Sequence, residues 1–320
     1  MDNQRKVIAL GFFDGVHLGH GALLRRVGER ARELDAVPCA FTFDSSPAAS
    51  LTGREVPLLT GVEDRRWLME ARYGIREVIV APFRLMRDMD WRDFVAGYLQ
   101  KELGAVHVVA GHDFRFGRGG EGTPQRLAEL CTRLGMGCDI IPKVELDGRT
   151  VSSTYIRTLA ADGDMEGAAR FLGHPHVLSG LVVHGNQIGR TLGTPTANLL
   201  VPDGVIAPAF GVYATRVILP DGGERLAVTN VGVRPTVNAG RTGVTVEPWI
   251  LDYRGDLYGA AIRLEFYKRL RPERKFGGVD ELRAAILENA EETRRYFAGE
   301  GEAPFFQPQK NQEDFCKNPE

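Results

Sequence analysis

The stretch GFFDGVHLGH, residues 11–20, carries two histidines, His17 and His20, behind a glycine-rich turn. Imidazole nitrogens in such a turn could ligate a metal, donate hydrogen bonds to a phosphate, or simply pack. A zinc site would need a third and usually a fourth ligand, and no cysteine pair with ligand spacing accompanies the histidines. A phosphate site needs a close approach of backbone and the N-terminus of a helix, and this stretch offers both.

The first half of the chain alternates apolar runs with amphipathic patterns, and this alternation indicates where the stretch lies. KVIALGFF, VPCAFTF, EVIVAPF, AVHVVAGH and CDIIPKV predict strands, and the segments between them predict helices. Continuous apolar strands separated by helices are typical of a doubly wound parallel sheet covered on both faces. Ligands of such sheets bind at the carboxyl ends of the strands, where GFFDGVHLGH, TFDSSP and GHDFRFG all fall.

The pattern changes after about residue 174. LSGLVVHG, GVYATRVILP, RLAVTNVGV, VTVEPWILDY and AIRLEFYKRL predict strands separated by turns, and a single helical pattern, VDELRAAILENAEETRRYFA, follows them. This order is typical of an antiparallel barrel or sandwich. We therefore predict an α/β domain over residues 1–174, a β domain over 175–300 and a disordered tail over 301–320.

The composition narrows the class of protein. A formal net charge of -2 over 320 residues gives no basic field that would favour nucleic acid. No apolar stretch is long enough to span a membrane, and the N-terminus lacks the apolar region of a signal peptide. The cysteines are scattered without ligand spacing, which is typical of reduced thiols and predicts a cytoplasmic protein; they are Cys39, Cys131, Cys138 and Cys316.

The H-x-G-H element resembles that of the nucleotidylyltransferase superfamily. The fuller string GFFDGVHLGH resembles the FMN adenylyltransferase module of bacterial bifunctional riboflavin kinase/FAD synthetases, and GHDFRFGRGGEG (111–122) and VSSTYIR (151–157) resemble later motifs of that module. Taken singly, these strings could be a turn and the N-cap of a helix. The resemblance implies a Rossmann-like domain that transfers the adenylyl group of ATP to FMN and releases pyrophosphate, without a covalent nucleophile.

Site residues follow from the same resemblance. It assigns His17 and His20 to the ATP phosphates and Arg157 to the leaving oxygens, all three as catalytic residues. It places Asp113 near the nucleotide and its metal. The nucleotide-binding residues that it implies are Gly11, Phe13, Asp14, Gly15, Gly19, Asp113, Ser153 and Thr154.

The chain departs from the module's usual pattern at two places. After the second strand the family carries T-F-[DE]-P-H-P, whereas this chain reads TFDSSP, with Ser45 and Ser46 in place of proline and histidine. The family's S-S-T-R-I-R appears as SSTYIR, with Tyr155 in place of an arginine. Each change removes a group that can carry positive charge.

The string GRTLGTPTANL (189–199) resembles the riboflavin kinase signature G-x-P-T-A-N, with Thr194 where phenylalanine is usual. The resemblance implies that Gly189 binds the ligand and that Thr196 and Asn198 bind both the nucleotide and a hard cation, Mg²⁺ or Mn²⁺.

Further along the same half, Glu247 matches the family's catalytic base, which accepts the proton of the ribityl 5′-hydroxyl as that oxygen attacks the γ-phosphate of ATP. The segment RPERKF (271–276) matches the stretch that borders the flavin pocket.

The resemblance as a whole implies an enzyme of flavin cofactor synthesis, a riboflavin kinase and FMN adenylyltransferase whose small-molecule partners are riboflavin, FMN, FAD and ATP. Two alternatives stand beside it. Ser45, Ser46 and Tyr155 are compatible with a riboflavin kinase whose adenylyltransferase domain is impaired or specialised. A non-catalytic flavin or nucleotide sensor is the other, and the presence of Glu247, Thr196 and Asn198 argues against it.

Overall fold

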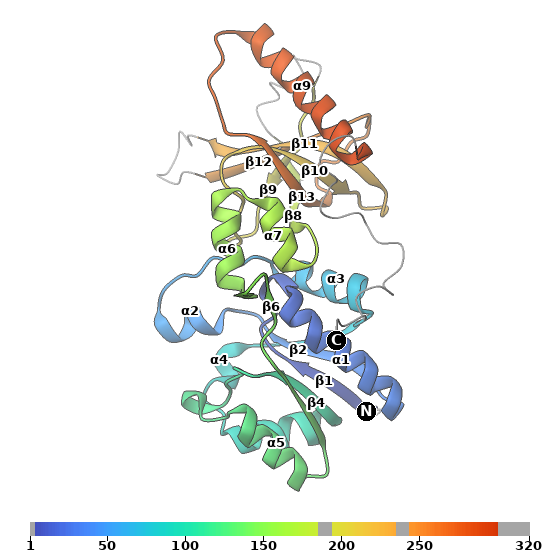
Figure 1. The fold of residues 1–320 in the computed structure, drawn as a ribbon, viewed down its shortest axis with the longest axis vertical. Helices are drawn as coiled ribbons and strands as arrows, with labels where there is room; N and C mark the ends of the chain where they lie inside the picture. The colour runs from blue at the N-terminus through green and yellow to red at the C-terminus, as the bar shows by residue number, and fades with distance from the viewer. Residues whose placement is uncertain (1–3, 185–193, 235–242, 300–320) are drawn as a thin grey trace. The chain divides into compact units, whose positions relative to one another are not determined.

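The computed structural model describes residues 4–184, 194–234 and 243–299 (Figure 1). Its contacts divide the chain into two compact units, Met1–Arg157 with Asp203–Ile206, and Thr158–Pro202 with Ala207–Glu320. The division falls within helix α6 (Ser153–Asp162). The predicted domain boundary at residue 174 stays a prediction, and the predicted tail lies outside the described residues.

The first unit is built on a five-stranded parallel sheet with the order β3-β2-β1-β4-β5. Its strands are β1 (Lys6–Leu10), β2 (Val37–Phe43), β3 (Glu77–Ala81), β4 (Ala105–Gly111) and β5 (Gly137–Ile141). The helical segments are η1 (Asp14–Val16), α1 (Leu18–Leu34), α2 (Pro47–Thr52), α3 (Val62–Tyr73), α4 (Phe83–Met86), the π-helix η2 (Asp93–Glu102), η3 (Arg118–Gly120) and α5 (Pro124–Arg133). A two-stranded hairpin, β6 (Glu145–Leu146) and β7 (Arg149–Thr150), precedes α6.

Helices cover both faces of this sheet. Ile8, Phe41 and Val108 belong to one buried cluster with side chains from η2 and α5. Because successive strand residues point to opposite faces, the neighbouring strand positions face the other side, where α1 packs along β1, β2 and β4. The predicted parallel α/β architecture is therefore confirmed.

The strand order determines where a ligand can bind. From β1 the chain runs to β2 and β3 on one side, and β4 then pairs with β1 on the other side. This reversal creates a crevice between the carboxyl ends of β1 and β4, the place where open α/β sheets bind their ligands. Residues 11–20 and 111–122 follow these two strands directly.

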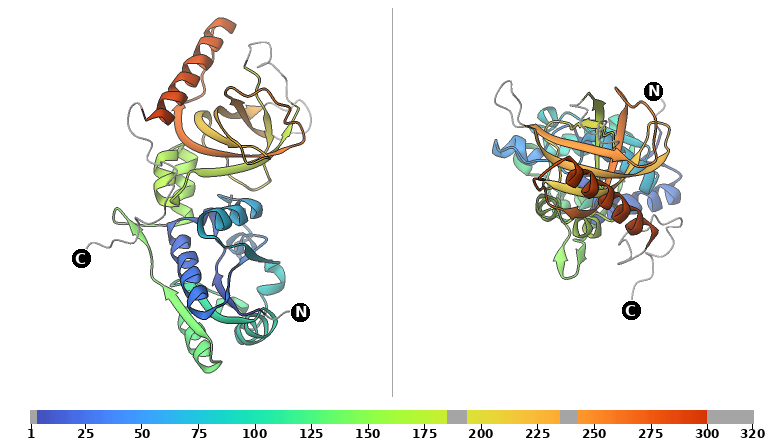
Figure 2. Two further views of the ribbon diagram at one scale, coloured as in Figure 1. Left: turned by 90° about the vertical axis from the view of Figure 1, so that its right-hand side faces the viewer. Right: turned by 90° about the horizontal axis from the view of Figure 1, so that it is seen from above.

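The second unit is an antiparallel barrel (Figure 2). The barrel is closed, and its strand order is β10-β11-β12-β9-β8-β13. Its elements are α7 (Met165–Leu172), β8 (His176–Val183), β9 (Asn198–Leu200), β10 (Gly211–Ile218), β11 (Glu224–Arg234), β12 (Gly243–Ile250), β13 (Ala261–Arg271) and α9 (Val279–Ala298). Helix α9 packs on β10 and β11, and α7 packs on β8 and β13. The structure thus resolves the predicted barrel or sandwich as a barrel with a C-terminal helix.

Gly180 marks a close approach of two strands in the barrel. A Cβ atom at this position would lie 2.6 Å from the carbonyl oxygen of Leu200. A side chain there would push β9 away from β8.

Within the part of the chain that the structure describes, no helix combines the length and apolar character that crossing a bilayer requires.

Candidate functional sites

The first unit contains a cavity of about 520 Å³ at the carboxyl ends of its strands, a size usual for small-molecule sites. Gly11 and Phe12 line it where β1 ends, and Gly111 and Asp113 line it where β4 ends. The N-terminal residues of α1 and α6 complete the wall, so two helix N-termini contribute to one cavity. This arrangement favours an anionic ligand.

The turn between β1 and α1 has an unusual backbone. Phe13 has φ of 58° and Val16 has φ of 43°, both in the left-handed region that side-chain-bearing residues rarely adopt. Gly15, between them, has φ of 78°, a conformation that glycine adopts without strain. The turn therefore holds local backbone strain beside the cavity, as is common at functional sites.

His17 and His20 stack in parallel at the start of α1, with ring centroids 3.6 Å apart. His17 caps the helix, because its Nδ1 accepts a hydrogen bond from the His20 backbone N–H at 3.3 Å. Burial lowers the pKa of His17 to about 4 and also lowers that of His20. Both rings are therefore neutral at pH 7, and with Nδ1 as the acceptor His17 carries its proton on Nε2.

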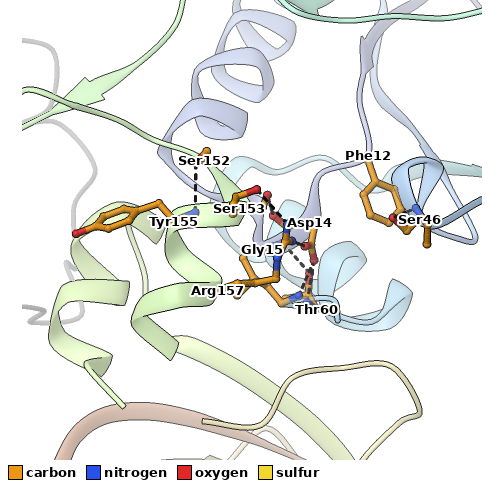
Figure 3. A network of polar contacts seen from close by, with 12 residues as sticks. Phe12, Asp14, Gly15, Ser46, Thr60, Ser152, Ser153, Tyr155 and Arg157 are labelled. Carbon is orange, nitrogen blue, oxygen red and sulfur yellow. Dashed lines mark hydrogen bonds and ion pairs between the residues drawn. The ribbon is translucent and has the colours of Figure 1, made fainter. Parts of the chain in front are cut away.

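Asp14 links the turn to the rest of the unit (Figure 3). Its Oδ1 accepts hydrogen bonds from the backbone N–H groups of Leu59 and Thr60, and its Oδ2 forms an ion pair with Arg157 at 2.8 Å. Its backbone carbonyl accepts a hydrogen bond from the Ser153 hydroxyl. Desolvation raises the pKa of the Asp14 carboxyl in spite of the nearby Arg157. One buried carboxylate thus ties the turn to helix α6 and to the segment before α3.

The structure brings most, but not all, of the predicted residues to the cavity wall. Seven of them line it: Gly11, His17, Gly19, His20, Asp113, Ser153 and Thr154. Four others lie outside the lining, namely Phe13, Asp14, Gly15 and Arg157. Phe13 and Asp14 are buried behind the wall, and the guanidinium of Arg157 is directed to Asp14.

The two departures from the family pattern have local structural roles. Ser46 caps α2, because its hydroxyl accepts a hydrogen bond from the backbone N–H of Ala49. Tyr155 lies beneath the guanidinium of Arg149, whose Cζ is 4.2 Å from the ring centroid. Arginine is therefore present beside position 155, although it comes from β7.

Three basic residues that the sequence analysis did not single out also line the cavity: Arg87, Arg115 and Lys143. Arg87 forms an ion pair with the adjacent Asp88, and Lys143 forms one with Glu145, two residues further along the chain. Arg115 lies inside the GHDFRFG motif, so the motif itself was the signal for this residue. Within the described residues, no three His, Cys, Asp or Glu side chains are grouped as a metal site.

A second cavity, of about 680 Å³, lies in the barrel unit, and Thr196 and Glu247 both line it. Strand β9 pairs with β12 through Leu199 and Val246, and the Ala197 N–H donates to the Pro248 carbonyl at 2.9 Å. These contacts hold the TPTAN segment next to the predicted base.

Other residues predicted for this unit are distributed around the barrel cavity. Thr194 is buried and lines it, and so does most of the RPERKF segment. Asn198 pairs with Val183 of β8 and is not in the lining. Gly189 lies outside the described residues. Asn230, which faces Glu247 across the β11–β12 ladder, and Asn289 of α9 also line the cavity. Asn230 lies in the predicted strand RLAVTNVGV and Asn289 in the final helical pattern, and neither was assigned to a site.

Fold and cavities together define a two-unit protein, with one cavity at the carboxyl ends of a parallel α/β sheet and a second cavity in a β-barrel unit. The sequence model of the family described as FAD synthetase matches residues 1–155, and that of the family described as riboflavin kinase matches residues 172–297.

Curated proteins extend the match to nearly the whole chain. The bifunctional riboflavin kinase/FMN adenylyltransferase of Bacillus subtilis (strain 168) is 35% identical over 301 residues, 93% of this chain and 94% of that protein. The protein of the same name from Escherichia coli (strain K12) is 34% identical over 294 residues, covering 91% and 92%. This chain belongs to the family of bifunctional riboflavin kinase/FMN adenylyltransferases.

A solved structure shares the fold of both units. The crystal structure of the macrolide-efflux protein from Streptococcus pneumoniae superposes with a TM-score of 0.79 and is 31% identical in sequence. The superposition covers 92% of this chain and 95% of that one.

Proposed function

We propose that this chain makes FAD in two steps, phosphorylating riboflavin with ATP in the barrel unit and then transferring the adenylyl group of a second ATP to FMN in the α/β unit. The observation that carries the proposal is the relationship to proteins named as bifunctional over more than nine tenths of the chain. Each cavity also lies within the residues that one of the two family models matches. The site geometry supports a role for each unit.

In the α/β unit, a phosphate oxygen of FMN attacks the α-phosphorus of ATP, the bond from that phosphorus to the bridging oxygen breaks, and pyrophosphate leaves. We assign His17 Nε2–H to the ATP phosphates as a neutral donor, with the His20 ring stacked against it in the same cavity wall. Ser153 and Thr154 also line the cavity, where the N-terminus of α6 offers backbone N–H donors. This chemistry needs positioning and stabilisation of charge, and no covalent intermediate.

In the barrel unit, we assign Glu247 as the base that accepts the proton of the ribityl 5′-hydroxyl while that oxygen attacks the γ-phosphorus of ATP and ADP leaves. Thr196, in the same cavity, offers a hydroxyl oxygen of the kind that Mg²⁺ prefers. Asn198, the second residue that the resemblance assigns to the cation, follows two residues later, outside the cavity lining. Mn²⁺ accepts the same oxygen ligands. When bound, the cation supplies charge neutralisation at the ATP phosphates.

An end-point assay tests the proposal. The purified chain is incubated with ATP, Mg²⁺ and either riboflavin or FMN, and the flavins are separated by chromatography. We expect FMN and FAD from riboflavin, and FAD from FMN. FMN without FAD would indicate a riboflavin kinase with an impaired α/β unit, as Ser46 and Tyr155 would allow, and the absence of any product would contradict both assignments.

A further inference from the structure

Arg65, in the first turn of α3, is fully buried at the carboxyl ends of β1 and β2. Its Nη1 donates hydrogen bonds to the Phe12 carbonyl at 2.7 Å and to the Thr42 hydroxyl at 2.8 Å. Its Nη2 donates to the Phe43 carbonyl at 3.1 Å. The guanidinium therefore joins the ends of two strands at the edge where the first cavity lies.

The charge of Arg65 has no carboxylate in contact. None of the ion pairs within the described residues includes it, and its Nε has no hydrogen-bond partner there. Asp14 and Asp44 act on it only at longer range, and burial lowers the pKa of Arg65 to about 10, so the side chain stays protonated at neutral pH. A buried cation without a partner ion is costly, and an apolar side chain in its place would avoid that desolvation.

A single aromatic ring connects this charge with the cavity. The Cζ atom of Arg65 lies 4.6 Å from the centroid of the Phe12 ring, and Phe12 lines the cavity. An apolar ring screens a charge far less than water does, so the field of the guanidinium extends into the cavity. The same charge contributes to the lowered pKa of His20, which also lines the wall.

We propose that Arg65 is a positioning residue of the adenylyl-transfer site: it fixes the Phe12 ring and supplies a permanent positive charge that attracts the phosphate groups of ATP. The inference rests on the proposed adenylyltransferase function and goes beyond it. A positive charge near the phosphates is needed from another residue, because His17 and His20 are neutral and cannot supply it.

Two variants separate the charge of Arg65 from its hydrogen bonds. R65M removes both, whereas R65K keeps the charge but cannot reproduce the two-pronged contact with three oxygens. We expect R65M to raise the KM for ATP in FAD synthesis from FMN by roughly tenfold or more, with a smaller effect on kcat. R65K is expected to restore this KM to within about threefold of wild type while its unfolding temperature stays lowered.

The riboflavin kinase activity of the same preparations is the internal control and should stay at the wild-type level. A wild-type KM in R65M, or an R65K as impaired as R65M, would overturn the inference. If R65M does not fold, R65Q, which keeps hydrogen-bond donors without the charge, takes its place under the same criteria. Wild-type protein that forms no FAD from FMN would instead overturn the proposed function, so the two failures are distinct.

Discussion

At the scale of single residues, His17 shows how one protonation state serves both the helix and the ligand. Nδ1 must stay unprotonated to accept the His20 N–H and cap α1, and this leaves Nε2–H as the donor. Protonation of the buried ring would break the cap and place a charge beside His20. Because burial lowers the pKa of His17 to about 4, the neutral form persists well below neutral pH.

This burial makes the stability of the chain depend on pH. Between pH 6.5, the ordinary pKa, and about 4, the unfolded chain binds a proton on His17 that the folded chain does not. The stability that the neutral, buried His17 contributes is therefore fully present above pH 6.5, and it is lost as the pH falls toward 4. The variant H17N keeps a capping side chain but has no imidazole to protonate. Between pH 7 and pH 5 we expect its free energy of unfolding to fall by about 2 kcal/mol less than that of the wild type.

Urea unfolding followed by tryptophan fluorescence at the two pH values measures this difference. Trp67 and Trp91 both lie in the α/β unit and report on it. Equal losses for H17N and wild type would contradict the neutral, buried state of His17.

Residue types and spacing led to the glycine and histidine residues of the first cavity, because a strand end followed by a helix N-terminus leaves little choice of position. They did not lead to Arg65. In VEDRRWLMEARYG, Arg65 and Arg66 both look like the polar side of an amphipathic helix. Only the packed structure shows that Arg65 is fully buried while Arg66 is partly exposed.

At the scale of elements, the turn η1 and helix α6 are distant in sequence and joined by Asp14. The VSSTYIR string supplies Ser153 and Arg157, one helical turn apart, so both reach the same aspartate. The sequence resemblance associated these residues with the triphosphate, whereas their contacts in the structure are with the turn. The ion pair between Arg157 and Asp14 therefore has a structural role, because it holds the turn against α6.

Variants of this pair distinguish the two roles of Arg157. R157M leaves a buried carboxylate without its cation, and we expect a loss of roughly 3 kcal/mol in the free energy of unfolding. Adding D14N removes the uncompensated charge and should restore part of that stability. The four chains compared are the wild type, R157M, D14N and the double variant. If Arg157 acts only by holding the turn, the KM for ATP should rise where the free energy of unfolding falls and should recover where it recovers.

The measurements are denaturant unfolding and the KM for ATP in FAD synthesis from FMN. A KM that stays raised in the double variant after its stability has recovered would show that Arg157 contacts the triphosphate directly.

The strands of the parallel sheet and the long helices matched their sequence patterns, down to the five-residue strand β3, whereas the three-residue strand β9 was not predicted. VPCAFTF and the final helical pattern coincide with β2 and α9, because each has a full period of apolar residues bounded by turn signals. Strand β9 has only three residues, Asn198–Leu200, which is too short for any periodic signal. It forms because β8 and β12 lie on either side of it, a contact that no local pattern contains.

At the scale of the whole molecule, the product of one unit is the substrate of the other. FMN leaves the proposed kinase reaction as the acceptor for adenylyl transfer, so riboflavin can become FAD on one protein. Among the described residues, none lines both cavities. A substitution in one cavity should therefore abolish one activity and leave the other intact.

Glu247→Gln tests this separation. We expect the rate of FMN formation from riboflavin to fall roughly a hundredfold or more, because glutamine cannot accept the proton of the hydroxyl. FAD formation from added FMN should continue at the wild-type rate in the same sample. A parallel loss of both activities would contradict the assignment of Glu247 to the barrel reaction alone, and full kinase activity would exclude it as the base.

The left-handed backbone at Val16 has a consequence for affinity. A branched side chain at positive φ costs on the order of 1–2 kcal/mol, and the hydrogen bonds and the ion pair of Asp14 hold the turn in this conformation. The ordering of the phosphate-facing backbone is thus completed when the chain folds. An arriving nucleotide meets a preorganised turn, so its binding carries a smaller entropy loss than a flexible loop would impose.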